Sequence, residues 1–399
     1  MQDSTKQRAF TLSSAVAALA TAAMIFGAAP ASAADGWTIQ PTPNPSGSQS
    51  SQLQDISCTS ATTCTAVGYY APSSGPVAQT LIESWDGTTW SIQPSPNPPG
   101  PTGNLVSYLQ GVSCNSASSC MAVGESINSS GTQTLAESWN GSTWSILPTP
   151  NPPGSTISFL LGVSCFSSTN CFAVGYQSTT GANTETLAEH WNGTSWSVQT
   201  TPDKNDSTSD RLAGISCASA ARCSAVGEYQ DNSGAENTMV EHWNGSSWLI
   251  QPSPDPSGSV FNELAGISCT TATNCVAVGA AEDASHTQVS LAEYWNGTTW
   301  VIQSTPNRPV AIYSELDSVS CTAISQCTAA GYFEPASGRF ETVAEHWNGT
   351  SWVLDGTPNP AGARDRYLYG IDCVEHGNCN AVGYYQPESG PSVTLAVTS

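Results

Sequence analysis

Basic residues are scarce in this sequence of 399 residues. It holds nine Lys and Arg against 31 Asp and Glu, which gives a formal net charge of −22. A chain this acidic repels the phosphates of nucleic acids and the headgroups of anionic membranes. The composition therefore excludes nucleic acid and anionic membrane surfaces as partners.

Long apolar runs are also lacking, apart from one near the N-terminus. That run extends from Ala15 to Ala29, follows the basic residues Lys6 and Arg8, and precedes Ala31-Ser32-Ala33. A basic start, an apolar stretch and a small-x-small site are typical of a secretory signal peptide. We expect a signal peptide over residues 1–33 and a secreted, extracellular mature protein. Nothing later in the sequence is apolar enough to span a membrane.

The familiar motifs of catalysis and of metal binding are missing as well. The sequence contains no nucleophile motif, phosphate-binding loop, calcium loop or clustered metal ligands. We therefore predict no catalytic residue, no cofactor and no metal site.

Cysteines are present in a strict pattern. All fourteen fall into seven C-x5-C pairs, and the steps between the first cysteines of successive pairs are 56, 51, 52, 52, 52 and 52 residues. A zinc site would need four ligands, and no further Cys or His accompanies each pair at a fixed spacing. In an exported chain an even number of cysteines favours disulfides. We predict one disulfide within each pair: Cys58–Cys64, Cys114–Cys120, Cys165–Cys171, Cys217–Cys223, Cys269–Cys275, Cys321–Cys327 and Cys373–Cys379.

Each repeat predicts four short strands. Examples are Leu212–Cys217, Cys223–Gly227, Thr186–Trp191 and Trp196–Gln199, bounded by Gly, Pro, Asn and Ser. Asn-Gly between the third and fourth strands favours a tight hairpin turn. Four strands in each repeat of about 50 residues are typical of a β-propeller. We predict an all-β fold, a single domain over residues 34–399 that forms a seven-bladed propeller of four-stranded blades.

The two ends of the sequence complement each other. The seventh repeat stops at Ser399 inside its third strand, and Trp37–Gln40 matches the missing fourth strand. The sequence therefore predicts a ring that the N-terminal strand closes.

In blade length and closure the pattern resembles the kelch and WD-type propellers, without their diagnostic motifs. The segment from Ser84 to Trp90 also resembles the Asp-box of sialidase-type propellers, although it is one residue shorter. The whole mature chain resembles uncharacterised repeat proteins exported by actinobacteria. That resemblance implies a propeller fold and brings no assigned activity.

Some polar residues recur in nearly every repeat. In six repeats, a glutamate lies two residues before the Trp that ends the third strand. In three repeats, a histidine lies directly before the same Trp. An enzyme acts near one axis, so catalytic residues should break the repeat. We expect structural roles for these residues, which are Glu83, Glu137, Glu189, Glu241, Glu293, Glu345, His190, His242 and His346.

Residues that differ between repeats are better candidates for function. Of the seven basic residues after the signal peptide, six fall near the loops between blades or between the second and third strands, which share one face of a propeller. Loops on a rigid scaffold often carry binding residues. We predict a ligand-binding site on this loop face, with arginines that contact carboxylates of a uronate, a sialic acid or a protein; its residues are Arg211, Arg308, Arg366 and Tyr367.

Three functions fit this sequence. The first is a monomeric, non-enzymatic binding or scaffold protein that recognises an extracellular glycan or protein through the loop face. The second is a multivalent lectin with a site in every blade. The third is a polysaccharide-acting enzyme, such as a glycosidase or a sialidase-like protein, whose candidate residues are Asp210, Arg211, Glu263, Glu315, Asp365, Arg366 and Tyr367.

Overall fold

The computed structural model describes residues 36–73, 77–98, 106–129, 131–179, 183–205, 207–308 and 311–399. All of them belong to one compact unit that spans residues 34–399. The signal peptide expected over residues 1–33 lies outside the described residues. In the described part of the chain, no helix is long and apolar enough to cross a membrane.

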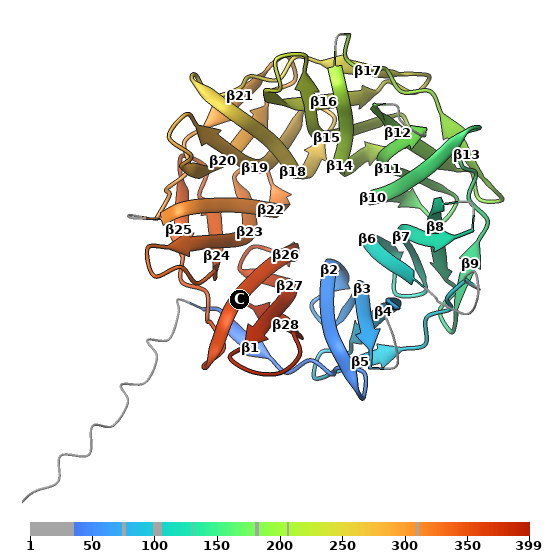
Figure 1. Ribbon diagram of the computed structural model, residues 1–399, viewed down its shortest axis with the longest axis vertical. Coiled ribbons are helices and arrows are strands. Elements are labelled where there is room, and N and C mark those ends of the chain that lie inside the picture. Colours follow the sequence, from blue (N-terminus) through green and yellow to red (C-terminus); the bar gives the residue numbers. More distant parts are fainter. Residues whose placement is uncertain are drawn as a thin grey trace, which may run out of the picture. The chain divides into compact units, whose positions relative to one another are not determined.

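The described residues form seven blades of four antiparallel strands around a central axis (Figure 1). In each blade the first strand lies nearest the axis and the fourth lies at the outer edge. The strands are, blade by blade: β2 (Ser48–Ser60), β3 (Thr63–Pro72), β4 (Gln79–Trp85) and β5 (Trp90–Gln93); β6 (Val106–Ser116), β7 (Ser119–Asn128), β8 (Gly131–Trp139) and β9 (Trp144–Leu147); β10 (Ser155–Ser167), β11 (Asn170–Thr179), β12 (Thr184–Trp191) and β13 (Trp196–Gln199); β14 (Ser207–Ser219), β15 (Arg222–Asp231), β16 (Glu236–Trp243) and β17 (Trp248–Gln251); β18 (Ser259–Thr271), β19 (Asn274–Asp283), β20 (Gln288–Trp295) and β21 (Trp300–Gln303); β22 (Ala311–Ala323), β23 (Gln326–Pro335), β24 (Glu341–Trp347) and β25 (Trp352–Asp355); β26 (Ala363–Glu375), β27 (Asn378–Pro387), β28 (Val393–Thr398) and β1 (Thr38–Gln40).

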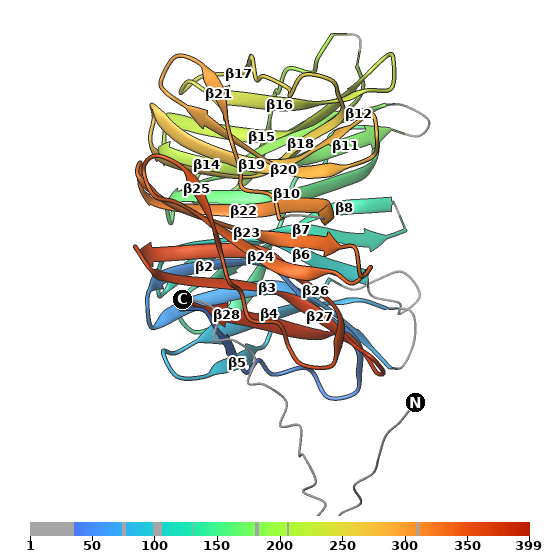
Figure 2. The ribbon, with the colours of Figure 1, turned by 90° about the vertical axis from the view of Figure 1, so that its left-hand side faces the viewer.

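The N-terminal strand closes the ring, as the sequence predicts. β1 pairs antiparallel with β28, and Ile39 lies opposite Val397. Beyond the strand, the Thr42 hydroxyl donates to the Thr394 carbonyl over 3.0 Å, which extends the contact between the two ends. The side view shows β26–β28 beside β2 and β3, where the last blade meets the first (Figure 2). The prediction of a closed seven-bladed propeller is confirmed.

All seven predicted disulfides are present, and they leave no free cysteine among the described residues. In each blade the two cysteines lie directly opposite each other in the first and second strands, as Cys58 and Cys64 do. The bond therefore fixes the turn between these strands. Each closed loop has only seven residues, so the entropic stabilisation is about 2 kcal/mol per bond at most.

Peptide mapping of the unreduced protein tests this pairing. We expect seven disulfide-linked peptides, each with two cysteines six residues apart, and no thiol that reacts with iodoacetamide in guanidinium chloride. One bond between two different repeats would contradict the assignment.

The core lies in the joints between neighbouring blades. Each blade contributes a first-strand leucine with no exposed surface, such as Leu53, and a fourth-strand tryptophan that is almost fully buried, such as Trp90. The Trp90 indole donates a hydrogen bond of 2.7 Å to the Gln40 side chain, which belongs to the preceding blade. Because every blade buries apolar surface only against its neighbours, the ring stabilises all blades together.

A chain of hydrogen bonds links the innermost strands of adjacent blades. In six blades the serine before the first cysteine accepts a bond of 3.0 Å from the backbone amide of the equivalent cysteine in the next blade. At the closing joint Asp372 replaces this serine, and its carboxylate accepts from the Cys58 amide at 2.7 Å. A charged acceptor makes a stronger bond than a hydroxyl. The joint that closes the ring is therefore reinforced.

The inner strands are longer than the sequence analysis predicted. β14 begins at Ser207 rather than at Leu212, and its partner β15 continues to Asp231. The register between them shifts by one residue between Leu212 and Gly214, which is a β-bulge. A Cβ atom on Gly227, opposite this bulge, would lie 2.0 Å from the Arg211 carbonyl oxygen, so only glycine fits there. Residues that we expected in loops, such as Arg211, therefore lie on strands.

The turn between the third and fourth strands also differs from a two-residue hairpin. Trp191 pairs with Trp196, so the loop has four residues. Within it, the Asn192 side chain accepts hydrogen bonds from the amides of Thr194 and Ser195, and Gly193 adopts a φ of 91°. The Asn-Gly pair therefore serves the turn, as expected, through the asparagine oxygen and the positive φ of glycine.

Candidate functional site

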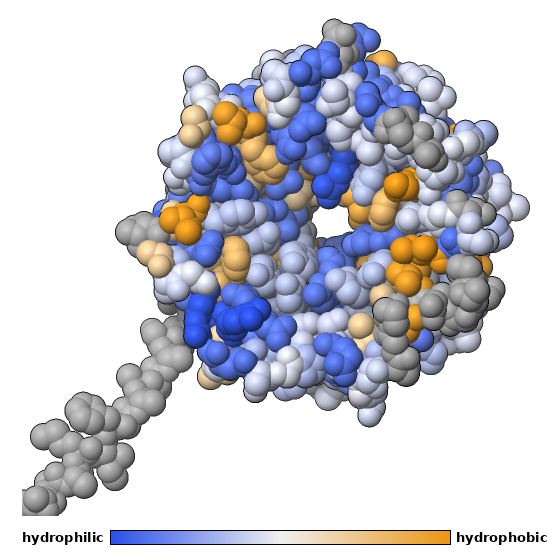
Figure 3. Space-filling model, viewed as in Figure 1, coloured by the Kyte–Doolittle hydropathy of each residue, from blue (hydrophilic) through white to orange (hydrophobic). Residues whose placement is uncertain are grey.

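The seven blades enclose a cavity of about 160 Å³ on the axis of the ring. Every blade lines it with its bulged first-strand residue, and these residues are Gln54, Gln110, Leu161, Ala213, Ala265, Asp317 and Tyr369. The space-filling view shows the opening at the centre of the ring, with hydrophilic residues along much of its border (Figure 3). We call this space the axial cavity.

The next layer toward the loop face has a different pair of residues in every blade. It consists of the first-strand residues two positions before the bulge and of the second-strand residues opposite them. These pairs are Gln52/Tyr69, Tyr108/Glu125, Phe159/Tyr176, Arg211/Glu228, Glu263/Ala280, Glu315/Tyr332 and Tyr367/Tyr384. We call this layer the axial mouth. Its backbone is the same in every blade, whereas no two blades have the same pair of side chains; the second-strand residue is Tyr in four of the seven.

Aromatic rings dominate one side of the axial mouth. In blades six and seven, Tyr332 meets Tyr367 edge to face with 4.8 Å between ring centroids, and Tyr367 stacks on Tyr384 at the same distance. In blades one and two, Tyr69 meets Tyr108 at 4.7 Å. Such contacts hold large flat surfaces in fixed positions near the axis.

Three of the four carboxylates of the axial mouth gather in blades four to six, and the fourth, Glu125, lies opposite Tyr108 in blade two. The Arg211 guanidinium forms an ion pair of 3.1 Å with Glu228. Glu315 has only 7% of its surface exposed, and it accepts hydrogen bonds from the hydroxyls of Tyr313 and Tyr332. Below them, Asp317 lines the axial cavity, and its Oδ2 atom is buried and has no hydrogen-bond partner. The site therefore joins aromatic faces to several carboxylates and one cation.

The carboxylates raise one another's pKa values. Burial comes first, and the nearby Glu315 and Glu228 then raise the pKa of Glu263 further. Burial, with the charges of Glu315 and Glu263, holds the pKa of Asp317 well above its usual range. For both groups burial is the largest cause, and the charges of the neighbouring carboxylates add to it.

The predicted site residues separate into two groups. Arg211 and Tyr367 lie in the axial mouth, at equivalent positions of blades four and seven. Arg366 instead donates to the carbonyl oxygens of Pro360 and Ala363, over 3.3 and 2.6 Å, and so holds its own inter-blade loop. The Arg308 guanidinium lies 4.7 Å from the centre of the Phe333 ring in the joint between blades five and six. The structure does not bring all three arginines together.

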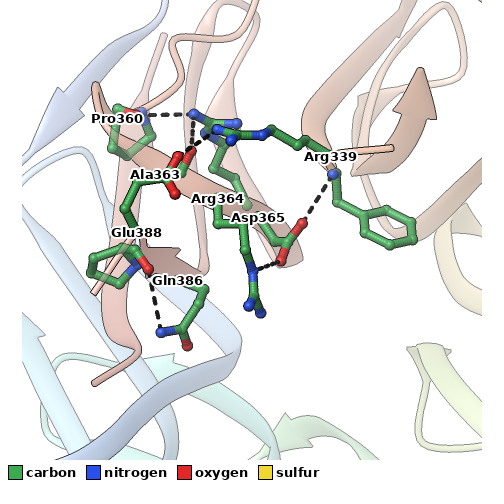
Figure 4. A network of polar contacts seen from close by, with 10 residues as sticks. Arg339, Pro360, Ala363, Arg364, Asp365, Gln386 and Glu388 are labelled. Atoms are coloured by element: carbon green, nitrogen blue, oxygen red, sulfur yellow. Dashed lines mark hydrogen bonds and ion pairs between the residues drawn. The ribbon is translucent and has the colours of Figure 1, made fainter. Parts of the chain in front are cut away.

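The other polar candidates also divide in this way. Glu263 and Glu315 lie in the axial mouth, whereas Asp365 accepts from the Arg364 side chain and the Phe340 amide. Asp210 is buried and accepts from the Ser207 hydroxyl at 2.7 Å. Figure 4 shows the network around Asp365, including the ion pair of 2.6 Å between Arg339 and Glu388. Asp365 and Glu388 thus hold the loop of blade six that carries Arg339 and Phe340 to blade seven.

Sequence reasoning missed the second-strand half of the axial mouth. Glu228, Tyr332 and Tyr384 belong to it because they pair with first-strand residues. A weak signal was available, since the residue after the repeated Ala-Val-Gly (Ala-Ala-Gly in the sixth repeat) is Tyr in four repeats, Glu in two and Ala in one. Its position relative to the first strand depends on the bulge, which the sequence pattern did not show.

The glutamates and histidines that recur in the repeats contact other side chains of the fold. The six strand-three glutamates have no exposed surface and face hydroxyl groups; the Ser253 hydroxyl, for example, donates to Glu293 over 2.6 Å. His190 stacks on Phe172 with 4.4 Å between ring centroids, and His346 bonds to Asp355 at 2.7 Å. Among the described residues, no group of three or more His, Cys, Asp or Glu side chains is arranged to hold a metal ion.

Comparison with known proteins supports the fold. No protein-family model and no curated protein sequence matches the chain. Similar solved structures include a protein of unknown function from Dyadobacter fermentans, with 11% identity, a TM-score of 0.53 and coverage of 92% of this chain and 98% of that one. The GH74 xyloglucanase from Xanthomonas campestris has 9% identity and a TM-score of 0.50, and the match covers 88% of this chain and 54% of the enzyme. A fucose-specific lectin from Aleuria aurantia gives 14% identity, a TM-score of 0.42 and coverage of 81% and 100%. At these identities, the first two likenesses show the fold alone.

Proposed function

We propose that the protein is a secreted, non-enzymatic binding protein that recognises a carbohydrate at the axial mouth. Seven disulfides require an oxidising compartment, which supports export of the mature chain, residues 34–399, after cleavage of the signal peptide. The binding surface is part of the loop face that the sequence analysis selected, with Arg211 and Tyr367 as the predicted residues that belong to it.

One observation carries the proposal. The axial mouth has a uniform backbone, yet its side chains form an aromatic side and a carboxylate side above a cavity. A sugar ring offers both matching surfaces, because its C–H face packs on an aromatic ring and its hydroxyls donate to carboxylates. The repeated positions elsewhere in the blades offer no such variety. One site for one ligand is therefore the arrangement that the geometry favours.

A glycan array followed by calorimetry tests this proposal. For the best glycan we expect one binding site per chain. Tyr367→Ala should weaken binding by ~1–3 kcal/mol, because it removes a ring face. Thr194→Ala, in an exposed turn on the opposite face, is the control and should leave binding unchanged.

Two outcomes would change the function. Several equivalent sites per chain, with binding unaffected by Tyr367→Ala, would favour a lectin with a site in each blade. Release of new reducing ends from the bound glycan, lost in Glu263→Gln, would favour the enzymatic alternative. We expect neither result.

A further inference from the structure

The charge of the axial mouth does not match a carboxylate ligand. Glu228, Glu263, Glu315 and Asp317 influence one another there, and Arg211 is the cation that faces them. Arg211 already bonds to Glu228. Burial and neighbouring carboxylates raise the pKa values of Glu263 and Asp317, so an anionic sugar would make their ionisation still more costly, whereas a cation beside them would favour their charged form.

Asp317 lines the axial cavity, and one oxygen of its carboxyl group has no partner. Its Oδ2 atom is buried without a hydrogen bond, although most buried polar atoms in proteins have one. A ligand in the cavity that donates hydrogen bonds and carries positive charge would favour the ionised form of the Asp317 carboxyl group.

Tyrosine rings stand beside these carboxylates. Tyr369 lines the axial cavity together with Asp317, and Tyr332 lies 6.2 Å from Tyr369 between ring centroids. The faces of aromatic rings attract organic cations, most strongly where water is excluded. Metal ions instead need several oxygen ligands at close range. The combination of tyrosine faces with carboxylates is thus suited to an ammonium group.

We infer that the ligand of the axial mouth is an amino sugar with a free, protonated amine, which inserts its ammonium group between the Asp317 carboxylate and the tyrosines of blades six and seven. This inference rests on the proposed function and specifies its ligand class. The net charge of −22 would also draw cationic ligands toward the protein.

Calorimetry with two tetrasaccharides provides the test, at a pH near 6 where the sugar amine is protonated. One is the tetramer of glucosamine, and the other is the tetramer of N-acetylglucosamine, which lacks the charge. We expect the glucosamine tetramer to bind at least ~10-fold more tightly. Asp317→Asn should remove most of this difference, because the amide keeps the size of the side chain and loses its charge.

The control variant is Glu185→Gln, which removes one negative charge from an exposed position on β12 and should leave both affinities unchanged. Asp317→Asn also removes a repulsive contact, so it should be at least as stable as the wild-type protein, and weaker binding would not report unfolding.

The outcomes distinguish the proposed carbohydrate site from the proposed ammonium site. Equal binding of both tetramers, weakened by Tyr367→Ala, would overturn the amine and keep the carbohydrate site. Binding of spermidine alone, lost in Asp317→Asn, would keep the ammonium site and overturn the carbohydrate. Failure of all three probes to bind would overturn the inference.

Discussion

Raising the pH from 5 to 8.5 is expected to lower the melting temperature of this protein by ~10 °C or more. The cause lies in the six glutamates on the third strands, which have no exposed surface. Burial raises their pKa values to about 8 in five cases and to about 7 for Glu345; the five are Glu83, Glu137, Glu189, Glu241 and Glu293.

The direction of the effect follows from proton binding. Between pH 4.5 and pH 8 the folded protein keeps these protons, whereas the unfolded chain has released them. Their contribution to stability is therefore complete below pH 4.5 and is lost as the pH rises through about 8. One pKa unit corresponds to ~1.4 kcal/mol, so each glutamate contributes up to ~5 kcal/mol, and the sum is an upper bound because water can enter the joints.

Differential scanning calorimetry at a series of pH values would measure this dependence. The double variant Glu189→Gln, Glu241→Gln should flatten the curve, because glutamine keeps the size and hydrogen-bonding capacity without an ionisable proton. Valine already stands at the equivalent position in blade seven, at Val397, so the fold does not require an acid there. Glu185→Gln, at an exposed position, should leave the curve unchanged. A melting temperature constant from pH 5 to 8.5 would refute the explanation.

Deleting residues 34–42 should destabilise the ring severely or drive self-association. The deletion removes β1, which pairs with β28, and the Trp37 side chain, which is only 4% exposed. It also removes Gln40, which accepts the hydrogen bond of Trp90 in blade one. The β28 edge would then be open to pairing with another chain. We expect a melting temperature lower by ~10 °C or more, or dimers and larger species in size-exclusion chromatography.

Two point variants distinguish the effect of losing a buried side chain from the effect of losing the N-terminal segment. Trp37→Ala should cost ~3–5 kcal/mol of unfolding free energy, because it empties a buried position between blades. Ile39→Ala, on the same strand but 42% exposed, should have a small effect. Denaturant unfolding of both variants would measure the difference. Equal stability of the truncated and full-length mature proteins would show that β1 does not close the ring.

Much of the fold could be predicted from the sequence, because the same pattern occurs in all seven repeats. The cysteine spacing predicted the blades and the disulfides, and Trp37–Gln40 predicted the closing strand. Strand ends were less accessible. The inner strands begin about five residues before the apolar pattern, since polar residues such as Ser207 extend them by backbone pairing alone.

The candidate site was accessible only in part. Arg211 and Tyr367 were found because they break the repeat on the first strand. Arg308 and Arg366 also break the repeat. However, the Arg308 side chain contacts an aromatic ring, and the Arg366 side chain contacts loop carbonyls. No sequence pattern distinguishes these arginines from one that lies in the axial mouth. Asp372 and Asp55 break the repeat too, and both accept backbone amide bonds between blades. Residues that depart from the repeat therefore occur at the joints between blades as well as in the candidate site.

The uniform bond from one blade to the next has an evolutionary consequence. Six joints use the same serine acceptor and the same cysteine amide, and the repeats are nearly equal in length. Unequal crossing-over between two internal repeats would add or remove one whole blade, and every new joint would still have its donor and acceptor. The complementary ends, with Asp372 and β1, would not be altered. In descendants of such a gene, the number of blades can therefore change by one at a time. The limit is the angle between neighbouring blades that is needed to close the ring.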